Sequence, residues 1–292
     1  MQETLTVIAQ VGILTFVVAG MAALGLSLKS SDIVAPLRNI KLVVLVIVAN
    51  FVLVPAIAIL AAKTLPMEPA ASAAVILIGC CAGAPFLPTL AKLAKGDAAL
   101  SVGVMVLLMV LTVVFAPIVV PLAIDGAQVS TWGIAQSLVF TMLLPLALGL
   151  IVNARYPDVA TAFGGGLSRA SSTGLAIGIV AGLFVTLREV LGAVGSWIFV
   201  GAAVVIIAGI LAGWLAGLGR TSSDRDVLGL GTAQRNIAAA LVIAPSLGHD
   251  VVVSTLVAAL VLPIVLISLA AEIGRRRARQ QAAAAQSGGK ER

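Results

Sequence analysis

GLGTAQRN, residues 229–236, is a glycine-rich polar run inside the otherwise apolar segment 227–244. If this segment crosses a membrane, Arg235 lies at bilayer depth, where a guanidinium costs from roughly 3 to more than 10 kcal/mol. None of the twelve Asp and Glu residues lies deep within an apolar segment and balances it. Its partner is therefore predicted to be backbone carbonyl and water, or a group from outside the chain. This combination indicates an anion or ion pathway.

The composition is that of an all-α polytopic membrane protein. Hydrophobic residues make up 61% of the chain, charged residues only 10%, and the mean hydropathy is +1.17, whereas soluble domains contain about 25% charged residues. Apolar runs of about 20 residues recur along the chain, which is typical of spanning helices rather than membrane strands. The net charge of +6 reflects basic residues at segment ends, so nucleic-acid binding is not expected and the lipid bilayer is the expected surroundings.

Nine spanning segments are predicted within a single transmembrane domain, residues 1–273. They are 5–28, 40–62, 70–91, 98–123, 131–153, 170–187, 195–218, 227–244 and 251–273. Short connections, among them a flexible loop at 155–166 that contains three consecutive glycines, leave no room for a soluble domain. Residues 274–292 are predicted to form a basic, disordered cytoplasmic tail.

The distribution of basic residues predicts the orientation. With the N-terminus outside, fifteen of the 18 Lys and Arg residues fall on the cytoplasmic face and only Lys63 and Arg188 on the other, while Arg235 lies within a segment. Cytoplasmic loops of membrane proteins carry such an excess of Lys and Arg. We therefore expect a multi-pass protein of the plasma (bacterial inner) membrane, with its N-terminus outside and its C-terminus cytoplasmic.

Two segments are interrupted in similar ways. GCCAGAPFLP, residues 79–88, and the 229–236 run place glycine or proline inside apolar segments, and both residue types weaken a helix. Unwound backbone at membrane depth is tolerated where it lines protein or a wet cavity. Two broken helices that enter from opposite sides indicate an inverted-repeat transporter with its site between them. The structural alternative is a pair of ordinary kinks in a helix bundle.

Five stretches of the sequence match family motifs in order: 21–28 with Ser31 and Asp32, 50–55, 79–83, 93–102 and 234–236. On these stretches the chain resembles the bile acid:sodium symporter family, and 234–236 falls where the family has Met-Gln-Asn. The resemblance covers essentially the whole chain. Bacterial members of the family typically have ten helices, and the nine predicted here imply a form that lacks the first, as in some animal members.

This resemblance implies a panel and a core that move as rigid bodies, with two crossed broken helices in the core. The panel would comprise 5–28, 131–153 and 170–187, and the core 40–123 and 195–273. It also implies organic anion substrates, such as bile acid-, keto acid- or pantoate-like acids, which positive helix N-termini suit. The substrate-binding residues would be Arg235, Asn236, Gln234, Thr232, Pro85 and Phe86.

The positions that match the family's sodium ligands have largely changed. A hard cation needs several oxygen ligands, preferably with a carboxylate. Asn50 and Ser101 keep a side-chain oxygen, but the other matching positions do not; these are Leu87, Pro88, Gly231 and Arg235. The sequence therefore predicts no metal site and no cofactor, and it argues against sodium coupling.

Three interpretations of Arg235 remain open: a fixed charge in the place of sodium, a direct contact to the substrate anion, or a structural group held by backbone carbonyls. No nucleophile with a base and an orienting partner stands out, so we do not expect an enzyme. We expect a secondary transporter of an organic anion that works by alternating access. The alternatives are a true sodium symporter with backbone-liganded sodium, and a non-transporting membrane sensor or scaffold.

Overall fold

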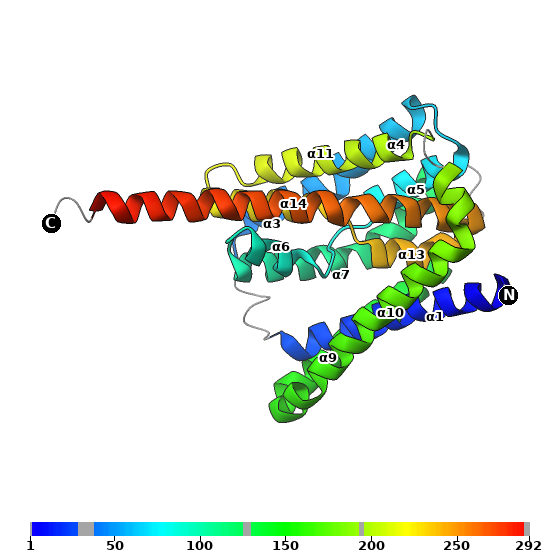
Figure 1. The fold of residues 1–292 in the computed structure, drawn as a ribbon, viewed down its shortest axis with the longest axis horizontal. Coiled ribbons are helices and arrows are strands. Elements are labelled where there is room, and N and C mark those ends of the chain that lie inside the picture. The colour runs from blue at the N-terminus through cyan, green and yellow to red at the C-terminus, as the bar shows by residue number, and fades with distance from the viewer. Residues whose placement is uncertain (1, 29–37, 125–129, 193–195, 289–292) are drawn as a thin grey trace.

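The computed structural model describes residues 2–28, 38–124, 130–192 and 196–288, and its regular structure there is entirely helical (Figure 1). Seven helical runs in this part are long and apolar enough to cross a membrane, and α5 (Pro69–Cys80) is a shorter apolar helix. The prediction of an all-α polytopic membrane protein is confirmed. Some residues used in the sequence argument lie outside the described residues: Lys29, Ser31, Asp32, Lys290, Arg292 and the side chain of Arg188.

Two of the long runs contain a π-helical turn in front of a proline. One run joins α3 (Ile40–Val48), η1 (Ala49–Leu53) and α4 (Val54–Thr64). The other joins α8 (Thr131–Leu138), η2 (Val139–Leu143) and α9 (Leu144–Arg155). A proline cannot donate to the carbonyl four residues earlier and clashes with it. Pro55 and Pro145 therefore widen the turn before them, and the first widened turn contains Asn50.

Both interrupted segments are broken helices, as predicted. The first comprises α5 and α6 (Leu87–Leu93), and the second α12 (Ser222–Ala233) and α13 (Ile237–Leu247). Residues 81–86 and 234–236 between the halves are not helical. Gly83 has φ +76°, a conformation that costs glycine little and other residues more. The breaks therefore follow from local backbone chemistry.

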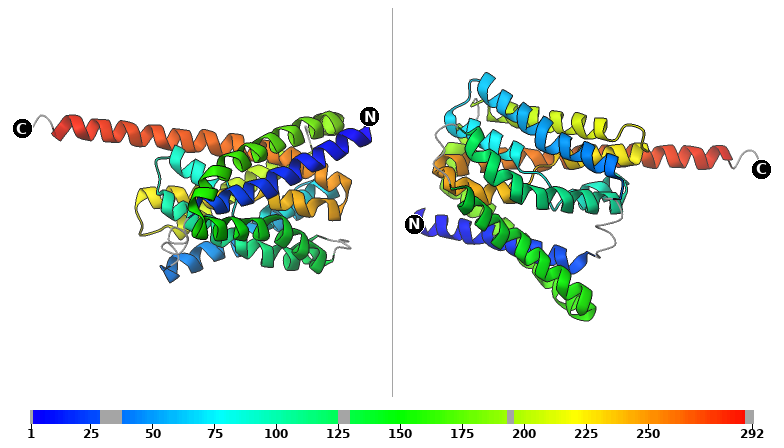
Figure 2. Two further views of the ribbon diagram at one scale, coloured as in Figure 1. Left: turned by 90° about the horizontal axis from the view of Figure 1, so that it is seen from below. Right: turned by 180° about the vertical axis from the view of Figure 1, so that it is seen from behind.

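The remaining helices complete two groups that lie side by side (Figures 1 and 2). The helices α1 (Gln2–Ser27), α9 and α10 (Pro157–Gly192) pack on one another. The other group comprises α3–α7, α11 (Ile198–Ala216), α12, α13 and α14 (His249–Gly288), with α7 spanning Ala98–Ala123. Close packing in the first group depends on glycine, since a Cβ on Gly25 of α1 would lie 2.3 Å from the carbonyl oxygen of Leu146.

Two predicted irregular regions are helical instead. The predicted loop 155–166 is a turn at Tyr156 followed by α10, so the three glycines at 164–166 lie within a helix. Pro157 suits a helix start. The residues before and after the three glycines continue the helix through them, because each glycine disfavours a helix by only about 1 kcal/mol. The predicted disordered tail continues α14 as helix through Gly288. Its Arg, Gln and Ala residues are strong helix formers.

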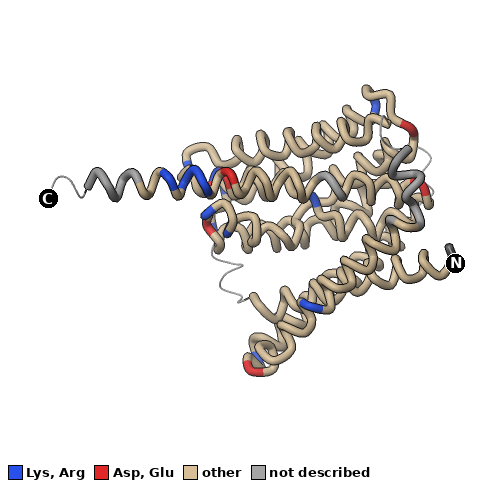
Figure 3. The backbone as a smooth tube through the Cα atoms, in the orientation of Figure 1, with Lys and Arg blue, Asp and Glu red and all other residues tan. Residues whose placement is uncertain are grey.

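Basic residues gather at one end of the helix bundle. Figure 3 shows them on α14 and on the nearby turns, at the end from which α14 extends. On this end Arg277 donates to Asp226 Oδ2 at 2.7 Å and to the carbonyl oxygen of Ala94 at 2.8 Å. These contacts join α14, α12 and the end of α6.

Candidate functional site: the crossing of the two broken helices

The two breaks touch each other through Asn236. Its backbone N–H donates to the carbonyl oxygen of Cys81 at 2.8 Å, and its Nδ2 donates to that of Gly83 at 3.0 Å. Its Oδ1 accepts from the backbone N–H of Ala239 at 3.0 Å and so caps α13. Asn236 is fully buried. One amide side chain therefore begins the second half-helix and fixes it to the first break.

A threonine of α7 holds the first break from the other side. Thr112 Oγ1 accepts from the backbone N–H of Ala82 at 3.0 Å and donates to its carbonyl oxygen at 2.9 Å. An unwound backbone inside an apolar bundle leaves polar groups that must be paired. Thr112 pairs both groups of Ala82.

The Arg235 guanidinium is 1% exposed and donates five hydrogen bonds. Its Nε donates to the carbonyl oxygen of Ile78 at 3.2 Å. Nη1 donates to Asn50 Oδ1 at 3.0 Å and to the carbonyl oxygen of Thr232 at 3.1 Å. Nη2 donates to the carbonyl oxygens of Gly79 at 2.6 Å and Asn50 at 3.4 Å. A guanidinium has five N–H groups, so each of them has a partner.

We call these five acceptors, Asn50 Oδ1 and the carbonyl oxygens of Asn50, Ile78, Gly79 and Thr232, the oxygen cage. Three of the carbonyls belong to the last turns of α5 and α12, where carbonyls carry partial negative charge. That of Ile78 also accepts from the backbone N–H of Cys81 at 3.2 Å. The fourth belongs to the π turn, and the Asn50 amide is oriented by donating to Thr232 Oγ1 at 3.1 Å. The cage thus surrounds one cation with oxygens in the absence of a carboxylate.

The other positions that match sodium ligands are closed by apolar packing. The side chain of Leu87 is buried, and a Cβ on Gly231 would lie 2.7 Å from Leu87 Cδ2. Leu87 therefore fills the space that a longer side chain at 231 would need. Ser101 is buried on α7, and its hydroxyl donates to the carbonyl oxygen of Ala98 at 2.6 Å. Pro88 contributes no side-chain oxygen, so these residues do not fit a sodium ion.

We call the group formed by α1, α9 and α10 the α1/α10 layer. A cavity of about 1020 Å³ lies between this layer and the crossing of the two broken helices. It reaches from Ser27 and Asn153, near the ends of α1 and α9, to Leu241 and Leu256 in the interior. Arg235 is the one charged residue among its lining residues in the described part of the chain. The cavity is therefore amphipathic, with apolar side chains of α1 on one wall and the polar crossing on the other.

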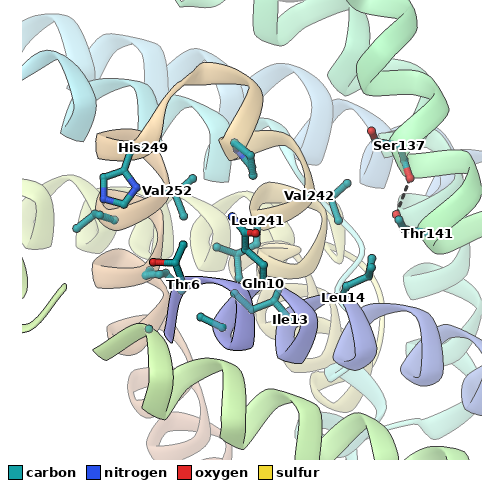
Figure 4. A pocket seen from close by; sticks show the side chains of 15 residues that line it. Thr6, Gln10, Ile13, Leu14, Ser137, Thr141, Leu241, Val242, His249 and Val252 are labelled. Atoms are coloured by element: carbon teal, nitrogen blue, oxygen red, sulfur yellow. Dashed lines mark hydrogen bonds between the residues drawn. The ribbon is translucent and has the colours of Figure 1, made fainter. Parts of the chain in front are cut away.

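A second cavity of about 600 Å³ lies toward the opposite end of α1, lined by Thr6 and Gln10 (Figure 4). His249, the first residue of α14, is exposed and lies at its edge, with Ser137 and Thr141 on the other side. Leu241 and Leu256 line both cavities. A pair of leucines thus lies between spaces that extend toward opposite ends of the molecule.

Five of the six residues predicted to bind substrate line the larger cavity. These are Arg235, Asn236, Gln234, Pro85 and Phe86. Thr232 is buried away from the cavity among the contacts of Asn50 and Arg235. The prediction missed the polar wall of α10, where Thr161, Ser168 and Ser172 face the same space. Their spacing of seven and four residues is a helical signal, which the supposed loop at 155–166 obscured.

Comparison with known proteins places the chain in a family. The model of the sodium bile acid symporter family matches residues 13–212. An uncharacterized sodium-dependent transporter of Bacillus subtilis is 31% identical over 138 residues, 46% of this chain and 42% of that protein. A probable chloroplastic sodium/metabolite cotransporter of Arabidopsis thaliana is 28% identical over 142 residues, 48% of this chain and 33% of that protein. The match thus spans less than half the length of these relatives. Since the family model covers most of the sequence, the chain belongs to the sodium bile acid symporter family.

Proposed function

We propose that this protein is a secondary transporter of an organic anion in which the Arg235 guanidinium stands in the place of a coupling cation. The observation that supports it most directly is the oxygen cage: five acceptors from α5, η1 and α12 surround one buried, covalently attached positive charge. The cage lies beside the large cavity, which Arg235 also lines. This geometry is that of a fixed charge held mainly by backbone carbonyls, which agrees with two of the three interpretations of Arg235. It speaks against direct substrate contact, because every N–H group already has a protein partner.

The cavity suits an anion with an apolar body. Asn236, Ile237 and Ala238 at the start of α13 line it, and a helix N-terminus carries partial positive charge and N–H groups that favour a carboxylate. The buried positive charge of Arg235, the residue before Asn236, adds to the positive electrostatic potential at this helix start. Apolar side chains of α1, such as Val17 and Met21, are available to the rest of the substrate.

In alternating access the α1/α10 layer would be the panel and would move against the remaining helices, which would form the core. The two cavities support this proposal because they extend toward opposite ends and share Leu241 and Leu256. The core keeps its crossing intact during such motion, since Asn236 and Arg235 hold the two breaks together. In this proposal nine membrane segments place the basic end in the cytoplasm of a bacterial plasma membrane.

Transport is expected to be insensitive to sodium. In proteoliposomes, uptake of labelled organic acids should change less than about twofold when choline replaces sodium, because a tethered cation already occupies the cage and Leu87 fills the space beside Gly231. Empty liposomes provide the background. A tenfold loss of uptake without sodium would instead establish the symporter alternative, and no uptake under either condition would favour the sensor or scaffold.

The orientation has a direct test. Single cysteines are placed at His249 and Arg279, which are both exposed. In intact cells a membrane-impermeant maleimide should label His249→Cys and leave Arg279→Cys unlabelled. The background should be low, since Cys80 and Cys81 are fully buried. Labelling of both positions from the same side would contradict the proposed topology.

A further inference from the structure

The long helical segment Thr131–Arg155 changes its packing partners partway along its length. Its first part, α8, buries Ile134 and Leu138 and packs on α7 and α13. Its last part, α9, packs on α1 and α10. Among the described residues, α8 has no comparable packing on α1 or α10. The segment therefore belongs to both groups of helices, and its partners change at η2.

The last part of this segment is held closely to α1. A Cβ on Gly149 of α9 would lie 2.5 Å from a backbone oxygen of α1, so the two backbones touch. Asn153 Nδ2 donates to the carbonyl oxygen of Leu28, just after α1, at 2.8 Å. α10 is bonded to α1 as well, because Ser171 Oγ donates to the carbonyl oxygen of Phe16 at 2.8 Å. The α1/α10 layer is therefore a single body, and α8 is attached to it only through η2 and the end of the chain that follows.

Three features make the helix easy to bend at η2. It is a π-helical turn, and such turns within α-helices are frequently found at functional sites. Pro145 has no N–H for the carbonyl oxygen of Thr141, four residues earlier, and its ring clashes with that carbonyl. Thr141 Oγ1 donates to the carbonyl oxygen of Ser137 at 2.6 Å (Figure 4), and a hydroxyl that bonds back by one turn often bends a helix. Sharp kinks arise at positions of this kind.

The other π-helical turn, η1, lies before a proline in the same way but has a different setting. α3, η1 and α4 all pack on α11, so this turn lies inside one group of helices. It places Asn50 in the oxygen cage. η2 differs because the packing partners change across it, which is the arrangement expected of a hinge between two bodies.

We propose that η2 is the hinge of alternating access, so that α8 stays with the core while α9 turns with α1 and α10. This inference rests on the proposed alternating access. It also divides the segment 131–153, which the resemblance to the symporter family assigns whole to the panel. The contacts of α8 with α7 and α13 stay buried throughout, whereas the contact of α10 with α14 opens.

The test opens that contact directly and needs no substrate. A Cβ on Gly182 of α10 would lie 3.7 Å from Leu256 Cδ1 of α14, so Gly182→Trp places a large side chain between the two helices. It should turn the α1/α10 layer against the core. Gly182→Phe, a smaller wedge, repeats the measurement if the tryptophan variant does not fold.

The readout is a set of three distances between spin labels, measured by electron–electron double resonance on the full chain in lipid nanodiscs. Labelled cysteines are placed in pairs at three exposed positions, Gln136 on α8, Arg155 on α9 and Ile207 on α11. The native Cys80 and Cys81 are fully buried, so their labelling should be low. Each pair is measured with and without Gly182→Trp.

We expect Gly182→Trp to shift the Gln136–Arg155 and Arg155–Ile207 distances by several ångström. The Gln136–Ile207 distance should stay within its original distribution. A comparable shift of the Gln136–Ile207 distance would overturn the hinge and leave alternating access standing, because α8 would then move with the layer. Three unchanged distances would overturn both proposals, since the layer would not turn when its contact with the core is opened.

Pro145→Ala tests the hinge itself. The alanine restores the N–H donor and removes the ring clash, so η2 can close into an ordinary helical turn. In the Gly182→Trp protein it should reduce the shift of the Gln136–Arg155 distance by about half or more. Pro117→Ala is the matched control, because Pro117 is a buried proline inside α7 and α7 packs within the core. It should leave the shift unchanged. A shift that survives Pro145→Ala in full would overturn the role of η2.

Discussion

Replacing Arg235 by alanine is expected to lower the melting temperature of the detergent-solubilised protein by roughly 6–20 °C. Removing one partner of a buried, hydrogen-bonded charge costs about 3–5 kcal/mol, and each kcal/mol shifts the melting temperature by about 2–4 °C in a domain of this size. The cost arises because five oxygens from three elements then lose the guanidinium that binds them together. Transport should be lost with the geometry of the crossing.

The oxygen cage allows a more specific expectation for the same variant. High sodium chloride should restore part of the melting temperature of Arg235→Ala, whereas choline chloride at the same ionic strength should not, because a small hard cation is bound by oxygens and choline is too large. Arg235→Lys should fall between the wild type and alanine, since an ammonium group has three donors for the five acceptors. Arg155→Ala, at an exposed arginine at the end of α9, should melt like the wild type. An unchanged melting temperature in Arg235→Ala would contradict the assigned role of the cage.

Replacing Asn50 by aspartate is expected to reduce anion uptake by about thirtyfold while Arg235 stays in place. Asn50 Oδ1 already accepts from Nη1 at 3.0 Å, so a carboxylate keeps this bond and cancels the buried charge. A substrate carboxylate that binds roughly 8 Å from the new carboxylate would be repelled by about 2 kcal/mol at an effective dielectric constant of 20, which is about thirtyfold in affinity. The measurement is the initial rate of uptake at low substrate concentration, with the melting temperature determined in parallel.

The substitution also removes the amide donor of Asn50, which bonds to Thr232 Oγ1 and to the carbonyl oxygen of Val46. The Thr232 hydroxyl can reorient and donate to the new carboxylate, so we expect Asn50→Asp to melt above Asn50→Ala. Asn39→Asp is the matched control, since Asn39 caps α3 with its Oδ1 and aspartate caps equally well. If Asn50→Asp transports at the wild-type rate, the charge of Arg235 does not act on the substrate and the residue is purely structural.

The breaks in the two helices could be predicted because their causes are local. Proline and glycine change the helical preference of their own turn, and Gly83 and Pro85 stand at the break itself. The helical course of 157–169 could not be predicted in the same way. Glycine signals argued for a loop there, whereas the structure continues the helix from Pro157 beyond them.

The sequence predicted which residues line the candidate site better than it predicted the role of each residue. Arg235, Asn236 and Gln234 were assigned together to substrate binding, and all three line the cavity. Their contacts differ, since Arg235 is saturated by the cage, Asn236 joins the breaks, and Gln234 keeps an unused acceptor. Adjacent residues in an unwound segment point in different directions, and a sequence does not state which direction each one takes.

The sequence by itself determined the membrane class, the positions of the breaks and the presence of an arginine with no acidic partner nearby. Each depends on composition or on interactions within a few residues, which the order of amino acids states directly. Only the tertiary structure decided what Arg235 binds, because its partners Asn50 and Ile78 lie 185 and 157 positions away in the chain. It also decided the shape of the cavity, since that depends on how closely α1 and α10 pack through their glycines.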